Sequence, residues 1–272
     1  MIKDSKKLYR EAMRVLKQTS RTFYIPITLL KPTLRKTVAS AYLCMRAIDE
    51  IEDHEQLPLE DKSSLLIRIS EMLTGSFDPE TYQNLIQPYA EKLPEVTLRL
   101  TDWLNICPTG VLDKVKKSTS IMASGMAKWA EKNWAIVTKE DFDDYTYYVA
   151  GLVGVMLSDI WDWYDGTKTD YELAIGFGRG LQCVNILRNQ DEDHVRGVNF
   201  LPENWDRADL FKYADDNLNL AENYIQSIET KNIVTFCQIP YQLAVKTLAV
   251  MKAGREKMTR EEVNTVVTEI TK

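Results

Sequence analysis

The chain contains few of the residues that build disulfide-stapled or zinc-knuckle proteins, with 4 cysteines and 2 histidines among 272 residues. The cysteines are far apart and form no CxxC pair, which indicates neither a zinc knuckle nor a disulfide framework. Two histidines are too few for a histidine-ligated metallohydrolase. Three of the cysteines lie in apolar runs, as buried free thiols do. We therefore expect a protein of a reducing, cytoplasmic compartment.

Glycine and proline are also scarce, with 11 and 9 residues. Together they make up about 7% of the chain against an average of about 12%, which favours helices over strands joined by turns. No apolar signal core follows the basic N-terminus. The most apolar stretch, residues 147–160, is shorter than the roughly 20 residues that a membrane span requires. We expect a soluble protein, and contact with a membrane surface stays open.

Acidic residues outnumber basic ones, 40 to 34, so the net charge is −6. This balance argues against nucleic acid as the main partner, because phosphate binding requires a basic surface. Hydrophobic residues make up 44% and charged residues 27% of the chain. Both values are typical of globular proteins and exclude wholesale disorder. The oligomeric state cannot be inferred from the sequence.

Apolar residues recur at helical spacing along almost the whole chain, and no strand-like alternation persists. Thr138 and Asp141 have the spacing of a capping box, which opens a helix, and Gly166 is expected to end it. Pro26 and Pro32 are expected to bracket a short linker. We find no internal repeat and no linker long enough to separate domains, so we predict one all-α domain over residues 1–272. Its long helices are expected at residues 33–54, 138–164, 171–194, 207–228 and 232–254.

Two of these helices carry polar stripes on otherwise apolar surfaces. On a helical wheel, five side chains of the first helix fall within about 60°: Arg35, Tyr42, Arg46, Asp49 and Asp53. A helix that is apolar nearly all round is buried, and buried carboxylates need cations or a metal to neutralise them. The alternative is a solvated acidic helix end whose charges pair at i,i+4 spacing. The second stripe spans about 80° and consists of Gln182, Asn185, Asn189, Asp193 and Arg196.

A lone stripe of amides is compatible with a hydrogen-bond network in the core, but two stripes ending in acids indicate a shared ligand. Mg²⁺ bound to a diphosphate fits, because Mg²⁺ combines one or two carboxylates with waters and phosphate oxygens. Arginines alongside would bind the remaining phosphate oxygens. Metal and arginine placed where charge develops lower the barrier to breaking the C–O bond of an allylic diphosphate. The candidate arginines are Arg21, Arg35, Arg46 and Arg188.

Five motifs then appear in order along the chain: SRTF at residues 20–23, YLCMRAIDEIED at 42–53, YVAGLVG at 148–154, QCVNILR at 182–188 and FCQIP at 236–240. Together they resemble the squalene and phytoene synthase family of head-to-head prenyltransferases. The resemblance covers nearly the whole chain. The DEIED, GLVGVMLS and FCQIP runs are more similar to squalene synthases than to phytoene synthases.

The resemblance implies an all-α isoprenoid-synthase fold with a central cavity. Two farnesyl diphosphates would condense there through presqualene diphosphate to squalene, with release of diphosphate and with NADPH as the hydride donor. It implies Mg²⁺ ligation by Asp49, Asp53, Asn189 and Asp193. Tyr148 would transfer a proton or contact diphosphate, with Tyr42 and Arg46 as further catalytic residues. Diphosphate binding would fall to Arg21, Arg35, Gln182, Asn185 and Arg188.

One position departs from the family pattern. Its second acidic motif usually reads DxxED, whereas this chain has Asn189 in place of the first aspartate and retains Asp193. An amide oxygen ligates Mg²⁺ without contributing charge, so we expect one metal to bind more weakly. Gly151 and Gly154, close to Tyr148, also have a structural interpretation in which they only allow two helices to approach closely.

Three functions stay open. The favoured one is a squalene-forming synthase. The second is a non-reductive relative that makes dehydrosqualene, or phytoene from geranylgeranyl diphosphate. The third is a family member that has lost catalysis and acts as an assembly or scaffold protein. A hydrocarbon product also makes peripheral docking to a bilayer plausible.

Overall fold

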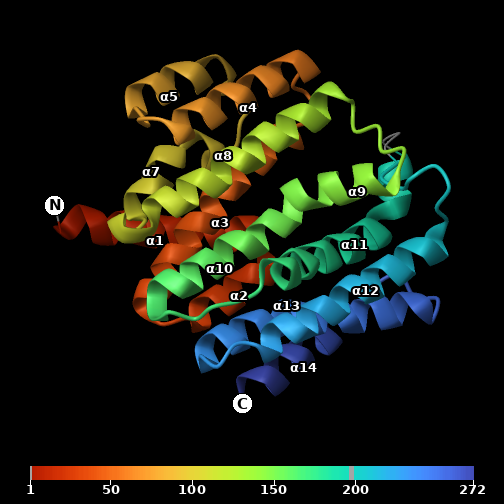
Figure 1. Cartoon of the computed structure of the whole chain (residues 1–272). Coiled ribbons are helices and arrows are strands. Elements are labelled where there is room, and N and C mark those ends of the chain that lie inside the picture. The colour runs from red at the N-terminus through yellow and green to blue at the C-terminus, as the bar shows by residue number, and fades with distance from the viewer. Residues whose placement is uncertain (1, 196–198) are drawn as a thin grey trace. The chain divides into compact units, whose positions relative to one another are not determined.

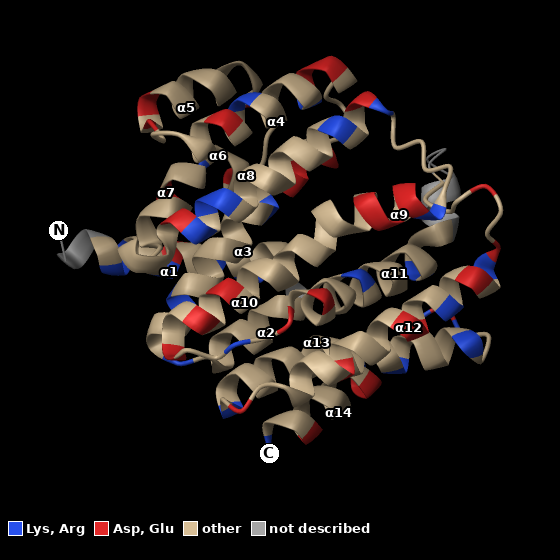
Figure 2. Cartoon of the chain, in the orientation of Figure 1, with Lys and Arg blue, Asp and Glu red and all other residues tan. Residues whose placement is uncertain are grey.

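The computed structural model describes the backbone of residues 2–195 and 199–272, and the side chains of these residues except 2–4, 21 and 191–195. The described residues form helices and no strand (Figure 1). The backbone contacts divide the chain into two compact units, Met1–Asn133 and Trp134–Lys272. The prediction of a single domain stays a prediction. Acidic residues occur on helices of both units (Figure 2).

Unit 1 is built around α3 (Pro32–Glu52), which contacts α1, α2, α4, α6, α7 and α8. Its surface explains this central position, because thirteen of its residues are buried. The helices around it are α1 (Ile2–Thr19), α2 (Arg21–Leu29), α4 (Leu59–Thr74), α5 (Pro79–Ile86), η1 (Gln87–Tyr89), α6 (Glu95–Leu98), α7 (Leu100–Ile106) and α8 (Thr109–Glu131).

Unit 2 is built around α11 (Tyr171–Val195), which contacts α9, η2, α10, α12 and α13. The two predicted polar stripes therefore lie on the central helices of the two units, apart from Asp53, which directly follows α3, and Arg196, which lies outside the described residues. The remaining elements are α9 (Lys139–Thr146), η2 (Tyr147–Gly151), α10 (Leu152–Asp165), α12 (Arg207–Gln226), α13 (Lys231–Lys252) and α14 (Arg260–Thr271).

The local helix signals behave as predicted at both ends of the segment from 138 to 166. Thr138 caps α9 by accepting the Asp141 N–H at 3.1 Å, and the Asp141 carboxylate accepts the Thr138 N–H in return. Gly166 ends α10 at φ 80°, a left-handed conformation that glycine adopts without strain. The predicted limits of the long helices agree with the structure to within about two residues at most ends, the scatter usual for helix ends.

The segment is helical from Lys139 to Asp165, as predicted, but a π-helical turn that the sequence did not indicate interrupts its α-helical pattern at η2. There the Leu152 N–H donates to the Tyr147 carbonyl oxygen five residues earlier. The interruption coincides with a backbone contact to α11. A Cβ on Gly178 would lie 2.2 Å from the Ala150 carbonyl oxygen, and one on Gly154 would lie 2.1 Å from that of Ala174. Gly154 therefore does allow close helix approach, and Gly178 matters equally.

The predicted linker between Pro26 and Pro32 is shorter than expected: Pro32 opens α3, but Pro26 lies inside α2, which continues to Leu29. Ser20 caps this helix by accepting the Phe23 N–H at 2.9 Å. Proline removes one backbone donor in a helix interior, and burial of Pro26, Ile27 and Leu30 offsets that loss.

All four cysteines are free and buried, as expected of core thiols. By length and composition, α13 is the one helix among the described residues that is long and apolar enough to cross a membrane. It packs against α11, α12 and α14, and helices from the cores of soluble proteins meet the same criterion, so this is weak evidence for a span.

Candidate active site

The C-terminal half of α3 brings Arg46 and a group of carboxylates together. Arg46 contacts Asp49 through Nη1, and its Nε and Nη2 donate to Glu50 Oε1 at 2.9 and 2.6 Å. The arginine side chain is 29% exposed. Burial disfavours its charged form, but Asp49 and Glu50 together raise the pKa of Arg46 above its ordinary value. Arg46 therefore stays a cation beside the carboxylates.

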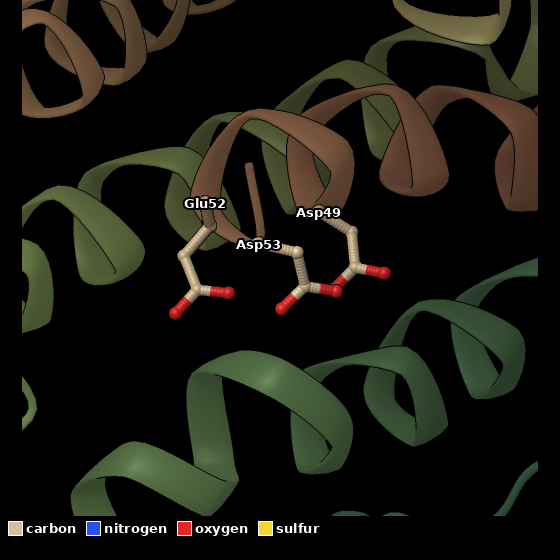
Figure 3. Close-up of side chains that lie close together, drawn as sticks. All are labelled: Asp49, Glu52 and Asp53. Atoms are coloured by element: carbon tan, nitrogen blue, oxygen red, sulfur yellow. The ribbon is translucent and has the colours of Figure 1, made fainter. Parts of the chain in front are cut away.

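Three carboxylates lie together at the end of this helix (Figure 3). One oxygen each of Asp49, Glu52 and Asp53 lies within 4.8 Å of the others. Glu52 is buried, Asp49 is partly buried and Asp53 is exposed. The sequence predicted Asp49 and Asp53 but missed Glu52. Its spacing from Asp49, three residues along a helix, was the signal that could have identified it.

The carboxylates of the cluster repel one another, and a bound cation would relieve this repulsion. Burial, followed by the charge of Asp53, raises the pKa of Asp49 to about 7, although Arg46 opposes the shift. Lys62 of α4 is buried and donates from Nζ to the Glu52 carbonyl oxygen at 2.6 Å. Burial lowers the pKa of Lys62, against the raising effect of Glu52 and Asp53. The cluster keeps excess negative charge even with this lysine beside it.

The donor set fits Mg²⁺. Magnesium takes hard oxygen ligands at about 2.0–2.1 Å and usually only one or two carboxylates, with waters and phosphates completing its shell. The three carboxylates supply hard oxygen atoms that lie within 4.8 Å of one another, the kind of donor that a divalent cation takes. Asp49, Glu52 and Asp53 are therefore the residues that would hold such an ion in unit 1.

The other predicted residues of unit 1 are more widely spread. Tyr42 is partly buried, its hydroxyl donates to the Thr19 carbonyl oxygen at 3.3 Å, and burial raises its pKa. Arg35 shares the angular position of the stripe but precedes Asp49 by fourteen residues, about 21 Å along the helix axis. Its Nε donates to the Leu30 carbonyl oxygen at 3.2 Å. Arg21 is the first residue of α2, and its side chain lies outside the described residues.

Tyr148 lies in the π-helical turn η2 of unit 2. It is half-buried, and its ring meets that of Tyr147 edge-on at 5.3 Å between centroids. A π-helical turn inside an α-helix is frequently found at a functional site. The turn contacts α11 through Gly178, one helical turn before Gln182.

The polar face of α11 is organised by Arg188. Its Nη2 donates to Asn185 Oδ1 at 3.0 Å and its Nε to Asn189 Oδ1 at 3.2 Å. Arg188 and Asn185 are exposed, whereas Asn189 and Gln182 are partly buried. The structure thus brings three of the predicted residues into one hydrogen-bonded group. The side chain of Asp193 and the backbone of Arg196 lie outside the described residues.

The carboxylate cluster of α3 belongs to unit 1 and the polar face of α11 to unit 2. Each is assembled within its own unit. The predicted central cavity, across which the two faces would share a ligand, stays a prediction.

The sequence and the fold of this chain were compared with those of known proteins. The squalene/phytoene synthase family model matches residues 16–210. The chain is 29% identical over 267 residues to the squalene synthase of Mus musculus, which covers 87% of this chain and 62% of that protein. It is 30% identical over 276 residues to the squalene synthase of Schizosaccharomyces pombe, covering 88% and 59%. The chain therefore spans about three fifths of the length of these relatives.

Solved structures share the fold. A complex of TcSQS with the ligand E5700 superposes with a TM-score of 0.79 at 24% identity, over 96% of this chain and 85% of that chain. A dehydrosqualene synthase in complex with a ligand gives a TM-score of 0.63 at 18% identity, over 99% and 97%. The helical fold, the carboxylate cluster on α3 and the family match over residues 16–210 together show that this chain belongs to the squalene/phytoene synthase family.

Proposed function

We propose that this protein is a Mg²⁺-dependent prenyltransferase that condenses two farnesyl diphosphates head to head. The first half-reaction joins C1 of one molecule to the allylic double bond of the other, releasing one diphosphate and one proton and forming presqualene diphosphate. The second releases the other diphosphate, and the rearranged carbocation accepts a hydride to give squalene. NADPH is the proposed hydride donor, and we assign no residues to it.

The carboxylate cluster of α3 supports this proposal most directly. Asp49, Glu52 and Asp53 lie in the segment that matches the family's first acidic motif, and their oxygens converge at the end of a central helix. A bound Mg²⁺ ion would supply positive charge to the departing diphosphate. Arg46 adds a cation on the same face of α3, held by Asp49 and Glu50.

The residues of unit 2 are assigned complementary roles. The guanidinium of Arg188, oriented by Asn185 and Asn189, is suited to bind phosphate oxygens bidentately. Gln182 offers an amide for hydrogen bonding on the same helix. The Tyr148 hydroxyl is the candidate group to receive the proton lost in the first half-reaction or to contact the diphosphate. Asn189 and Asp193 are the proposed second metal ligands.

One incubation separates the possible reactions. Purified protein is supplied with farnesyl diphosphate and Mg²⁺, with and without NADPH, and diphosphate and hydrocarbon products are measured. We expect diphosphate release in both mixtures and squalene only with NADPH. A C30 polyene formed without reductant, or a C40 product from geranylgeranyl diphosphate, would establish the non-reductive reaction instead. No diphosphate release from either substrate would contradict the proposal and leave the scaffold function.

We also propose that the reaction takes place in the cytoplasm. The four cysteines of the chain are free and buried, which supports a reducing compartment. Fractionation of cells that produce the protein tests this, and recovery from an oxidising compartment would contradict it.

A further inference from the structure

The positive charge of this acidic chain is concentrated at its start. Residues 1–36 contain ten Lys and Arg against two Asp and Glu, a net charge of 10 − 2 = +8. The whole chain carries −6, so residues 37–272 carry −6 − 8 = −14. A basic segment on a strongly acidic protein gives the molecule one face that an anionic partner attracts.

The basic residues of α1 lie along one side of the helix. At 100° per residue, five cations fall within about 100° of its circumference, and all five are exposed. The opposite side of the helix carries Ala12, Val15 and Leu16, which are buried in unit 1. The structure therefore holds α1 by its apolar side and presents its basic side to solvent. The cations of this basic stripe are Lys6, Lys7, Arg10, Arg14 and Lys17.

Most of the basic stripe is not neutralised within the protein. Lys6 and Arg10 form no ion pair with any residue that the structure describes. The ammonium of Lys7 is 3.9 Å from a carboxylate oxygen of Glu11. Arg14 alone has a close acidic partner, Glu95, at 2.5 Å.

An apolar pair adjoins the end of the basic stripe. The Lys17 ammonium lies 5.7 Å from the centre of the Tyr24 ring, which ties α1 to α2. The next residue, Ile25, and Leu29 one turn later are each 41% exposed. Residues four apart lie about 40° from each other on a helix, so the two side chains form one exposed aliphatic ridge. Lys31, also exposed, follows at the end of α2.

We propose that the basic stripe of α1 and the Ile25–Leu29 ridge of α2 form a docking surface for a bilayer with anionic headgroups. Cations near such a surface attract it by about 1 kcal/mol each, and aliphatic side chains insert into the boundary between headgroups and acyl chains. The ridge favours a membrane over nucleic acid, because aliphatic side chains insert into a bilayer, whereas most protein contacts to nucleic acid are hydrogen bonds to phosphate and sugar. Repulsion of the acidic remainder from the same bilayer orients the molecule with α1 and α2 toward it.

Vesicle co-sedimentation of the full-length protein, without substrate, tests this surface. We expect binding to vesicles containing equal parts of phosphatidylglycerol and phosphatidylcholine, and little binding to phosphatidylcholine alone. Binding should weaken between about 0.1 M and 1 M salt, as the Debye length falls from about 10 to 3 Å. Equal binding to both vesicles, or none to either, would overturn the proposal.

Substitutions locate the surface. Lys6, Arg10 and Lys17 together changed to glutamine should weaken binding to anionic vesicles about 100-fold, from about 1 kcal/mol or fivefold per cation. The matched control changes Lys231, Lys257 and Arg260 to glutamine, since these exposed cations of unit 2 form no ion pair with described residues. The control should bind as the unchanged protein does. Equal losses in both variants would show that only net charge matters.

The apolar ridge has its own measurement. Ile25→Ser with Leu29→Ser should reduce binding roughly tenfold, because two partly exposed aliphatic side chains no longer insert. This loss should persist at high salt, unlike that of the charge variant. A circular dichroism spectrum and melting curve confirm that each variant is folded. A folded ridge variant with unchanged binding would show that Ile25 and Leu29 do not take part in docking.

A soluble anion is the competing ligand for the same cations. Inorganic diphosphate added at millimolar concentration should leave vesicle binding largely intact, whereas full displacement would identify the basic stripe as a diphosphate site. The proposal is independent of the reaction, since vesicle binding is measured without substrate. Failure of condensation therefore leaves it standing, and failure of docking leaves the proposed reaction standing.

Discussion

Glu52 shows how the surroundings of a single residue decide its role. On the helical wheel it falls about 60° from Asp49 on the side away from Asp53, so it lies outside the stripe that the sequence indicated. In the structure it is buried, and Lys62 contacts its backbone from α4. The long side chain brings its carboxylate back toward those of Asp49 and Asp53. The candidate metal site thus contains one ligand more than predicted.

Removal of a carboxylate from the cluster should stop the reaction. Asp49→Ala and Asp53→Ala are each expected to lower Mg²⁺-dependent diphosphate release by about 10³-fold or more, as the loss of a group that stabilises developing charge does. Glu52→Gln should reduce Mg²⁺ affinity, measured by isothermal titration calorimetry. Near-normal turnover in both aspartate variants would show that this cluster is not the metal site.

The raised pKa of Asp49 predicts how stability depends on pH without metal. With a pKa of about 7 in the folded protein and an ordinary value of 3.8, the folded state binds the proton more tightly than the unfolded chain. The free energy of unfolding should therefore fall as the pH rises from about 4 to 7. At 1.36 kcal/mol per pKa unit, the limit is about 4 kcal/mol, and residual exposure reduces it.

Asp49→Asn removes the buried negative charge and with it the loss of stability between pH 4 and 7. In the presence of a chelator, the variant should melt at a higher temperature than the unchanged protein at pH 7.5, and the difference should shrink toward pH 4. Glu50→Gln is the matched control, because it takes a carboxylate from the same arginine. Glu50 raises the pKa of Asp49 less than burial and Asp53 do, so the control should raise the melting temperature less than Asp49→Asn. A variant no more stable at pH 7.5 would contradict the prediction.

Asn189 is the position where this chain departs from the family motif. Its side-chain oxygen accepts from Arg188 at 3.2 Å, so an aspartate there would keep this contact and add charge. Asn189→Asp should raise Mg²⁺ affinity about tenfold, about 1.4 kcal/mol, and preserve activity in a Mg²⁺ titration of turnover. Complete loss of activity would show that Asn189 has a role other than ligation.

At the scale of elements, the π-helical turn η2 is the feature that packing decides. The segment from 138 to 166 has the caps of one helix, yet α11 approaches it so closely that glycine is required at Gly154 and Gly178. The turn places Tyr148 in an irregular part of the backbone, next to the helix that carries Gln182. This arrangement agrees with the proposed role of Tyr148, because π-helical turns are frequently found at functional sites.

Gly178→Ala tests the contact. Alanine normally stabilises a helix relative to glycine by about 1 kcal/mol, but here the new Cβ would lie 2.2 Å from the Ala150 carbonyl oxygen. The substitution should destabilise the protein by about 1–3 kcal/mol, lower its melting temperature and reduce diphosphate release. Gly75→Ala is the control, because a Cβ there would lie 3.6 Å from its nearest neighbour, the Glu71 carbonyl oxygen. This variant should keep the melting temperature and the diphosphate release of the unchanged protein. A stabilised Gly178→Ala variant would contradict the close approach.

At the scale of the whole molecule, the proposed reaction requires the two polar faces to share one ligand. A crystal structure with Mn²⁺ and diphosphate, in which anomalous scattering locates the metal ions, tests this. We expect Asp53 and Asp193 each to ligate Mn²⁺ bound to the same diphosphate. Asp53 and Asp193 on opposite outer surfaces, with no cavity between them, would end the proposal of a shared site.

Much of this protein follows from short-range patterns. Helical periodicity predicted the all-α fold, the Thr138–Asp141 spacing predicted a capping box, and Gly166 predicted a helix end. These features depend on residues within a few positions of each other, and a sequence displays them directly. The Asp49 and Asp53 pair is of the same kind, since one turn of helix brings both carboxylates together.

Contacts between distant segments decided the remainder. Glu52 joins the cluster where Lys62 of α4 contacts the end of α3, η2 lies where α11 approaches a backbone carbonyl, and Pro26 stays helical on a side of α2 that is buried. Each outcome depends on atoms far apart in the chain, whose packing outweighs the local preference. The sequence alone therefore determined the fold class and the principal acidic pair, and the tertiary structure determined the third carboxylate and the backbone around Tyr148, because only folding brings those partners into contact.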